Sequence, residues 1–293
     1  MILVTGATGR IGGEVVRGLH RLDVPVRALV HTPEKAASIA LPGVEIVNGD
    51  FANPDDMKSM VRGIDKVFLL SPSGPDQPEL EGHLVDAAVA GGVRHIVKLS
   101  VLGATSLTTI ALNRWHWESE HHIEETNIPY TFLRPHFFMQ NCLMFAPTIA
   151  AEGRFYAPLT GAKMAMVDLR DIASVAVAVL TNVGHEYRAY DITGATAITY
   201  DDIAAALTGV LAKPVRYVNV PLEAARDALL DTGAAEWLAD DMVEYFRFFN
   251  EGYGESVSST IRRVARKEPI CVDQFAADYA DAFRAGAEVG RAA

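Results

Sequence analysis

The segment NRWHWESEHHIEETNIPY, residues 113–130, gathers side chains that could do chemistry: three histidines, four glutamates and two tryptophans. Such a composition fits a metal site, a solvated acidic helix or a helix that borders an active site. A zinc-binding helix of the H-E-x-x-H type places two histidines four residues apart, and no pair among His116, His121 and His122 has that spacing. Metal binding is therefore disfavoured, and the choice between the other two depends on the surrounding fold.

A glycine-rich loop near the start of the chain is a second chemical signal. VTGATGRIGGEVVRGL spaces Gly6, Gly9 and Gly12 three residues apart, between a strand-like segment and an amphipathic helical one. Glycines allow a tight turn and a close approach of the backbone, and the N–H groups at a helix start can bind a pyrophosphate. The loop predicts a dinucleotide site, with the expected residues Gly6, Thr8, Gly9, Arg10, Ile11 and Gly12.

The chain around this loop alternates between short apolar runs and helical patterns. Strands are predicted at residues 1–5, 25–30, 44–48, 66–71, 95–100 and 130–135. Helices are predicted at residues 11–22, 54–62, 78–91 and 113–127. Nearly continuous apolar strands separated by helices are typical of a parallel sheet covered on both faces. The chain is therefore predicted to be an α/β protein with a Rossmann-like, doubly wound parallel sheet.

The regular alternation breaks down after RPHFFMQN, residues 134–141. Helices then predominate, with isolated strands such as AYDIT and VRYVNV within residues 189–220. We assign both strands to a smaller lobe. Residues 1–150 are expected to form the NAD(P)-binding domain, with part of the later chain returning to it. Residues 151–293 are expected to form mainly a C-terminal α/β substrate lobe.

The bulk composition restricts the class of partner. The chain is 49% hydrophobic and has a formal net charge of −11, which disfavours binding to nucleic acid or an anionic membrane. The apolar run IASVAVAVL is about half of the ~20 residues that a membrane helix needs. No signal peptide is apparent, and Cys142 and Cys271, both expected to be buried, fit a reducing compartment. We expect a cytoplasmic protein with a small-molecule partner, and a homodimer is compatible with the sequence.

The spacing G-x-x-G-x-x-G resembles that of extended and atypical short-chain dehydrogenase/reductases. The whole chain is similar to one branch of them, the NmrA-like family, which includes NADPH-dependent quinone and triphenylmethane dye reductases. The resemblance runs from TGATG through GDF and RPHFFMQN to TYDDIAAAL and PVRYVNVPLE. Its second motif is TNIPYTFLRPHFFMQN, residues 126–141, which resembles the strand-six signature of the family.

The end of the second predicted strand bears on cofactor choice. Sites that prefer NAD usually carry an acidic residue there for the ribose 2′-hydroxyl, but this strand is followed by His31 and Thr32. The absence of an acid favours NADP(H) over NAD(H). Family members that prefer NADPH commonly have arginine at the position of His31, and Arg10 and Lys35 could supply the missing charge here.

Other strand ends are assigned by the resemblance. It implies that Asp50 and Phe51 bind the adenine, that Leu70 and Ser71 lie beside the pyrophosphate and ribose, and that Pro135 and Phe137 wall the nicotinamide. The alternative for Asp50 is a turn or helix-cap residue before NPDD. The implied substrate pocket consists of His136, Phe138 and Asn141, which suggests a flat, apolar or aromatic substrate. The alternative for the two phenylalanines is an interdomain core.

The resemblance also implies the candidate catalytic residues. Short-chain reductases usually use a tyrosine with a lysine four residues later, and none of the nine tyrosines here has that partner. Alignment places Leu112 at the tyrosine position and His116 at the lysine position, and Ser100 where the family keeps an active-site serine. An imidazole with a pKa near ~6.5 can act as an acid at neutral pH. His116 is therefore predicted to be the proton donor, oriented by Glu120 one helical turn on.

Three functions remain open at this point. The first is an NADPH-dependent reductase of quinone, dye, azo or imine acceptors, because hydride transfer needs the cofactor to be positioned and does not strictly require the tyrosine. The second is an NADP-sensing regulatory protein without catalysis. The third is a reductase or isomerase of one dedicated biosynthetic intermediate.

Overall fold

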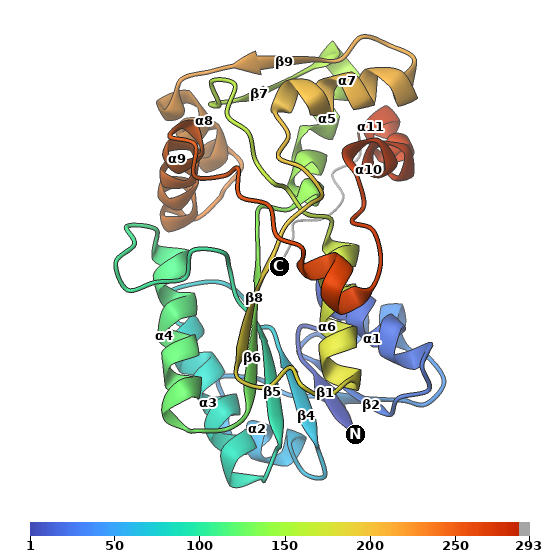
Figure 1. Ribbon diagram of the computed structural model, residues 1–293, viewed down its shortest axis with the longest axis vertical. Coiled ribbons are helices and arrows are strands. Elements are labelled where there is room, and N and C mark those ends of the chain that lie inside the picture. Colours follow the sequence, from blue (N-terminus) through green and yellow to red (C-terminus); the bar gives the residue numbers. More distant parts are fainter. Residues whose placement is uncertain (287–293) are drawn as a thin grey trace.

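The computed structural model describes residues 1–286. Seven parallel strands form the main sheet in the order β3-β2-β1-β4-β5-β6-β8 (Figure 1). The strands are β1 (Ile2–Val4), β2 (Val26–Val30), β3 (Val44–Asn48), β4 (Lys66–Leu69), β5 (His95–Leu99), β6 (Tyr130–Pro135) and β8 (Arg188–Ile192). This order, which reverses direction after β1, confirms the predicted doubly wound α/β fold.

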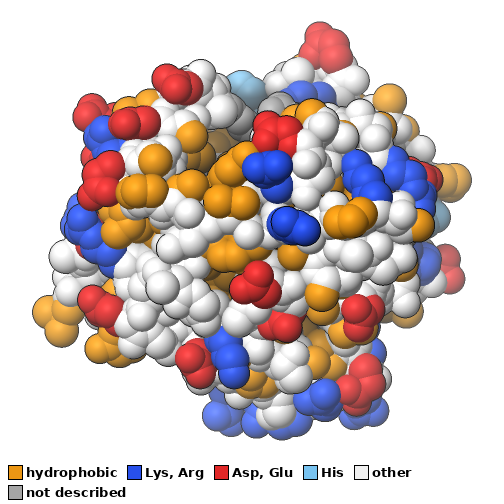
Figure 2. Space-filling view, turned by 90° about the horizontal axis from the view of Figure 1, so that it is seen from above, with side chains coloured by type: hydrophobic (Ala, Val, Ile, Leu, Met, Phe, Trp, Pro, Cys, Tyr) orange, Lys and Arg blue, Asp and Glu red, His pale blue; other side chains and the backbone are white. Residues whose placement is uncertain are grey.

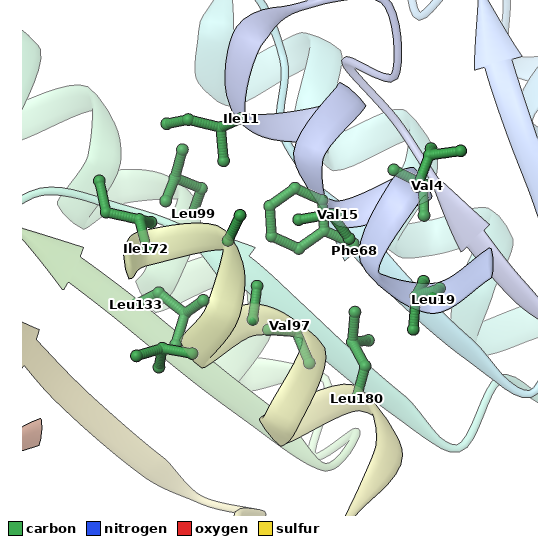
Figure 3. Close-up of a cluster of buried hydrophobic side chains, with 14 of the residues drawn as sticks. Val4, Ile11, Val15, Leu19, Phe68, Val97, Leu99, Leu133, Ile172 and Leu180 are labelled. Carbon is green, nitrogen blue, oxygen red and sulfur yellow. The ribbon is translucent and has the colours of Figure 1, made fainter. Parts of the chain in front are cut away.

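Helices cover both faces of this sheet. One face packs against α1 (Arg10–His20) and α6 (Leu169–Thr181), and the other against α2 (Pro54–Met60), α3 (Gln77–Ala90) and α4 (Ala111–Glu125) (Figure 1). Figure 3 shows the first of these layers, in which strand residues such as Phe68 and Val97 meet Val15 of α1 and Ile172 of α6. Phe68 is fully buried, so its replacement by alanine would cost about 3–5 kcal/mol.

The close crossing of α1 and α6 depends on a glycine. A Cβ added at Gly18 of α1 would lie 2.7 Å from Cγ2 of Val177 in α6. The missing side chain therefore lets the two helices approach closely over the sheet. This packing determines where the first turn of α1 lies.

A smaller lobe is formed by the later chain, together with a two-stranded parallel sheet of β7 (Arg154–Ala157) and β9 (Arg216–Asn219). The remaining elements there are η2 (Met139–Phe145), α5 (Ala146–Glu152), α7 (Tyr200–Leu211), α8 (Leu222–Asp231), α9 (Glu236–Asn250), α10 (Val272–Asp278) and α11 (Ala280–Ala285). Its separate core includes the buried rings of Phe155, Phe275 and Phe283. Figure 2 shows acidic and basic side chains interspersed over this end of the molecule.

The assignment of AYDIT to the smaller lobe was wrong. This segment lies in β8, which pairs in parallel with β6 and extends the main sheet. The preceding helix α6 packs against α1, so α6 and β8 together form one more helix-and-strand unit of the large domain. With the short helix η3 (Ile261–Ala265), which packs against α6, they are parts of the later chain that return to it.

Two further expectations concern cysteines and membranes. Cys142 is buried, but Cys271 is exposed at the start of α10, so the expectation of burial was wrong for Cys271. Within residues 1–286, no helix has the length and apolar character required to cross a membrane.

Candidate active site

The glycine turn lies between β1 and α1. Gly6 has a φ of +58°, and a Cβ added there would lie 2.8 Å from Cγ of Leu70 at the end of β4. A Cβ at Gly12 would overlap the carbonyl oxygen of Gly6. Gly9 caps α1 without a side-chain hydrogen bond, so the N–H groups of the first turn remain directed toward the loop. This cradle fits a pyrophosphate, because glycines keep the turn tight where side chains would force its backbone apart, and the N–H dipoles at the start of α1 favour an anion.

Thr5 holds the two strand ends beside this turn, a role that the sequence reasoning missed. Its buried hydroxyl accepts a hydrogen bond from Leu70 N–H at 2.8 Å and donates one to the Leu70 carbonyl at 2.9 Å. The position of Leu70 relative to Gly6 is thereby fixed. A cavity of about 150 Å³ opens next to the turn beside Arg10, and Gln140 and Tyr279 line it from the smaller lobe.

The outer edge of the site is formed by the ends of β2 and β3. His31 follows β2 and Lys35 lies in the 3-10 helix η1 (Pro33–Ile39), and both side chains are exposed. Asp50 follows β3, and its Oδ1 accepts a hydrogen bond from Ala52 N–H at 3.0 Å. Asp50 therefore has the turn role that was weighed as the alternative. Phe51 is half-buried against the core under the sheet. The roles of these residues toward adenine and ribose stay predictions.

A buried polar network lies at the ends of β4 and β5, under α3 and α4. Lys98 Nζ is 2.5 Å from Glu81 Oε2, with both side chains at most 1% exposed. Glu81 Oε1 accepts a hydrogen bond from the Ser71 hydroxyl at 2.8 Å. The His116 ring joins the same network, because its Nδ1 lies 3.0 Å from Gln77 Nε2 and 3.3 Å from Lys98 Nζ. The structure thus brings Ser71 and His116 together through three residues that the sequence reasoning did not select.

One signal in the sequence could have identified this network. Lys98 stands inside HIVKLS, an otherwise apolar run in the middle of a parallel sheet. A lysine is almost never fully buried unless it is paired, so a carboxylate partner had to exist. The residues around Lys98 do not show which carboxylate this is, because Glu81 lies on a different element, α3.

The premise for His116 as a protonated acid does not hold. Burial, and then the positive charge of Lys98, lower the pKa of His116 well below its ordinary range. The ring is therefore neutral at physiological pH and cannot supply a proton as an imidazolium. Its position in the network remains compatible with a role as a hydrogen-bond donor.

Glu120 does not orient His116, in contrast to the prediction. Its carboxylate accepts hydrogen bonds from Nε and Nη2 of Arg134, the former at 3.0 Å. Glu120 is thereby directed toward β6, where Arg134 is half-buried. Hydrogen bonding to Glu120 raises the pKa of Arg134. This pair ties α4 to β6 and leaves His116 to Gln77 and Lys98.

The other histidines of the opening segment have separate partners on the surface. His121 lies 3.4 Å from Glu125, and His122 lies 2.9 Å from Asp86 of α3. Within the described part of the chain, no three His, Cys, Asp or Glu residues are grouped as metal ligands would be.

Ser100 directly follows β5. Its backbone N–H donates to the Leu133 carbonyl at 2.7 Å, and its side chain is 2% exposed. The buried hydroxyl has no hydrogen-bond partner within residues 1–286. Its predicted catalytic role stays a prediction.

The RPHFFMQN segment joins the two lobes where β6 ends at Pro135. His136 is 5% exposed, its Nδ1 accepts a hydrogen bond from Phe137 N–H at 2.7 Å, and its ring stacks on Phe249 of α9 at 5.4 Å. Burial lowers the pKa of His136 to about 4. Phe137 packs on the core of the smaller lobe and Phe138 on that of the large domain. These phenylalanines therefore contribute to both cores, as the alternative proposed.

The roles of this segment in the cofactor and substrate sites remain untested. Asn141 is half-buried in η2, close behind the two phenylalanines in the chain. The predictions for Pro135, Phe137, His136, Phe138 and Asn141 therefore stay predictions.

The start of α4 is held by α9 of the smaller lobe, through contacts that the sequence reasoning also missed. Asp241 accepts hydrogen bonds from Ala111 N–H at 2.8 Å and Leu112 N–H at 2.7 Å, which caps α4 from another element. The Tyr245 hydroxyl donates to Asn113 Oδ1. Burial raises the pKa of Tyr245, so this tyrosine keeps its proton at neutral pH and is a weaker acid than a free tyrosine.

Comparisons with known proteins agree with this architecture. A model of the NmrA-like family matches residues 1–276. An NAD(P)H azoreductase from Xenophilus azovorans is 40% identical over 285 residues, which cover 97% of this chain and 100% of the relative. A (4-alkanoyl-5-oxo-2,5-dihydrofuran-3-yl)methyl phosphate reductase from Streptomyces griseus is 37% identical over 284 residues, which cover 97% and 99% of the two chains.

A solved structure extends the similarity to three dimensions. The NADPH-dependent quinone oxidoreductase of Escherichia coli, crystallised with NADPH, superposes with a TM-score of 0.86 at 28% identity. The superposition covers 95% of this chain and 99% of that one. The match to the family model and the full-length similarity at 40% identity confirm the resemblance inferred from the glycine and strand-six motifs. The chain belongs to the NmrA-like family.

Proposed function

We propose that this chain is an NAD(P)H-dependent reductase that transfers hydride to conjugated acceptors of the azo, quinone or dye type. The observation that carries the proposal is the 40% identity to an NAD(P)H azoreductase over 97% of the chain. The glycine cradle supports it independently, because the tight turn at Gly6 and Gly12 leads into a helix start without a side-chain cap, which suits a pyrophosphate.

NADP(H) is the proposed cofactor, in preference to NAD(H). No acidic residue stands directly after β2, where His31 and Thr32 lie, so the usual carboxylate that would repel a 2′-phosphate is missing. Lys35 is exposed on η1, and Arg10 is the first residue of α1. These two helices pack against each other. Lys35 and Arg10, on these neighbouring elements, are the proposed cationic partners of the 2′-phosphate.

In this proposal some residues bind the cofactor and others contribute to the reaction. The bound nicotinamide would supply the hydride. The first turn of α1 would hold the pyrophosphate beside Leu70, which Thr5 fixes next to Gly6. The Pro135–Phe137 segment would hold the nicotinamide ring against a flat substrate. The side chain of Ser100 and the neutral ring of His116 supply polar groups at the neighbouring strand end and helix.

Steady-state oxidation of NADPH and NADH with a panel of azo dyes, quinones and triphenylmethane dyes tests the proposal. We expect turnover with at least one acceptor class and a higher kcat/KM with NADPH. Tight cofactor binding without turnover across the panel would support the regulatory alternative and refute the reductase. A higher kcat/KM with NADH would refute the cofactor preference alone.

A second candidate is reduction of a dedicated biosynthetic intermediate. The Streptomyces griseus phosphate reductase, 37% identical over 97% of this chain, favours it. A phosphorylated butenolide added to the same panel distinguishes the two candidates, because a dye reductase would give it no advantage in kcat/KM over a dye.

The remaining organisation is part of the same proposal. Residues 1–138, with α6, β8 and η3, would form the cofactor domain, and η2, α5 and the rest of the later chain would form the substrate lobe, so the expected boundary at residue 150 moves to the end of the Phe137–Phe138 pair. The protein would act in the cytoplasm on a small apolar or aromatic substrate, as a monomer or a homodimer, without a nucleic-acid or membrane partner.

A further inference from the structure

The Lys98–Glu81 pair is costly to bury. Lys98 is in a central strand of the sheet, its side chain is 0% exposed and that of Glu81 is 1% exposed. A buried ion pair is often no more stabilising than apolar residues of the same volume, because both ions lose their hydration. Stability alone therefore does not account for it, and the other contacts of the pair indicate what it does.

The contacts of His116 Nδ1 determine where the ring carries its proton. Lys98 Nζ at 3.3 Å can only donate a hydrogen bond, and so can Gln77 Nε2 at 3.0 Å. Gln77 is held in this orientation because the same amide group is 3.4 Å from Glu81 Oε1, which accepts. Two donors facing Nδ1 require a lone pair on that atom. The ring proton of the neutral imidazole must then lie on Nε2.

The second ring nitrogen of His116, Nε2, lies on the side of the ring away from this network. Within the described residues, Nε2 of His116 has no hydrogen-bond partner, and this atom is not fully buried. His116 as a whole is 7% exposed. Its Nε2–H is therefore partly accessible to solvent although the residue is buried.

We propose that Lys98, Glu81 and Gln77 are positioning residues that hold His116 neutral with its proton on Nε2, so that Nε2–H is a fixed hydrogen-bond donor to the substrate. This inference rests on the proposed reductase function. Hydride adds to one atom of the conjugated acceptor, and the displaced π electrons move to its oxygen or distal nitrogen. In a neutral quinone or azo acceptor that atom becomes negative and accepts the hydrogen bond from Nε2–H. It then takes a proton from water, which leaves hydroxide, and His116 is unchanged.

A neutral imidazole suits this task because it stays the same over the working pH range. A neutral histidine can polarise an acceptor without giving up its proton, as in triosephosphate isomerase. The groups that face this part of α4 are Lys98 and Ser71 from the sheet, Glu81 and Gln77 from α3, Arg134 from β6, Asp241 and Tyr245 from α9, and Glu120 of α4 itself. Lys98 is the nearest charge to the ring, and Glu120 is taken up by Arg134. Protonation of His116 is opposed both by burial and by Lys98.

Nitrogen NMR of the full chain carrying ¹⁵N-labelled histidine tests the positioning role directly. The His116 signals are identified as those missing from His116→Gln. We expect a neutral ring protonated on Nε2, unchanged between about pH 6 and about pH 8. In the double variant Lys98→Met, Glu81→Gln, which leaves no buried charge unpaired, the ring should stay neutral because it is still buried, but part of the population should carry the proton on Nδ1, because the ammonium donor facing that atom is gone. Protonation of the parent ring on Nδ1, or its titration near the ordinary pKa, would overturn the proposal. The parent spectrum decides this even if the double variant does not fold.

Kinetics test the donor role separately. His116→Leu should lower kcat on the order of 100-fold, with little change in the KM for NADPH, because the lost bond forms mainly as charge develops. His116→Gln places an amide N–H near the position of Nε2 and should restore part of the rate. The matched control is His122→Leu, an exposed histidine of the same helix, which should leave kcat unchanged. Equal rates for His116→Leu and the parent would overturn the donor role.

The two experiments distinguish this inference from the proposed function. If no acceptor is reduced, the reductase proposal fails while the NMR result still reports whether the network fixes the ring. If turnover is found but the parent ring titrates, the reductase proposal stands and the positioning role fails.

Discussion

The two halves of the main sheet are built on different principles. Around β1, β2 and β3 the elements meet through apolar side chains and glycines, and Gly6, Gly12 and Gly18 each mark a place where a side chain would collide with a neighbour. Around β4, β5, β6 and α4 the interior instead contains polar groups, including the Lys98–Glu81 pair. One half uses backbone shape, which suits a cofactor common to many enzymes. The other uses paired charges and hydrogen bonds, which can orient catalytic groups.

The largest expected effect concerns the buried pair itself. Lys98→Met leaves the Glu81 carboxylate buried without its cation and should lower the free energy of unfolding by about 3–5 kcal/mol. Urea unfolding measures this. The double variant Lys98→Met, Glu81→Gln should recover most of the loss. Lys58→Met, which removes an exposed partner of Asp55, should cost no more than about 1 kcal/mol. Equal losses of unfolding free energy for Lys98→Met and Lys58→Met would mean that the buried ion pair does not distinguish the polar half of the sheet.

The second prediction is a pH dependence of stability that arises in the polar half. Burial lowers the pKa of His95 in β5 and of His136 after β6 to about 4, from an ordinary value of 6.5. Between those values the unfolded chain binds protons that the folded chain does not. Their contribution is therefore fully present above pH 6.5 and is lost as the pH falls toward 4, by about 3 kcal/mol for each ring.

Unfolding free energies measured across that interval check this dependence. His95→Gln should make the slope shallower. His122→Gln, which removes an exposed histidine, should leave the slope as it is. A slope that is identical in the parent and in His95→Gln would contradict the assignment to His95.

The third prediction concerns the glycine half. Gly12→Ala introduces a Cβ that overlaps the Gly6 carbonyl, so the turn must shift and cofactor affinity should fall on the order of 100-fold. Titration of NADPH fluorescence measures it. Gly209→Ala in α7 has open space around its Cβ and is the control, which should bind NADPH as the parent does. Retained affinity in Gly12→Ala would mean that the turn does not contact the cofactor.

The smallest expected effect is at the edge of the cofactor site. His31→Arg places a permanent charge after β2, and we expect the ratio of NADPH to NADH affinity to rise up to about 5-fold, because exposed ion pairs contribute no more than about 1 kcal/mol. His20→Arg, at the far end of α1, adds the same charge away from the turn and should leave the ratio unchanged. An unchanged ratio in His31→Arg would place the 2′-position elsewhere.

Much of the large domain was predictable from local patterns. The bounds of β3 and β6 match the predicted strands at both ends, and α1, α3 and α4 begin within two residues of their predicted starts. Apolar periodicity and glycine spacing report local backbone conformation, so they locate elements and the glycine turn well. They also carried the resemblance to the NmrA-like family, which the comparisons confirm.

The sequence by itself therefore determined the α/β fold, the glycine turn and the family. Tertiary structure alone decided that β8 extends the main sheet, that Glu120 pairs with Arg134 and that Lys98 pairs with Glu81. The physical reason is that these pairings join elements that are distant in the sequence. Local sequence patterns do not indicate which of several chemically identical carboxylates a given cation will meet. The histidine in NRWHWESEHHIEETNIPY shows the consequence. His116 could be selected by alignment, but its protonation state depends on a lysine and a glutamine that only the folded chain brings to it.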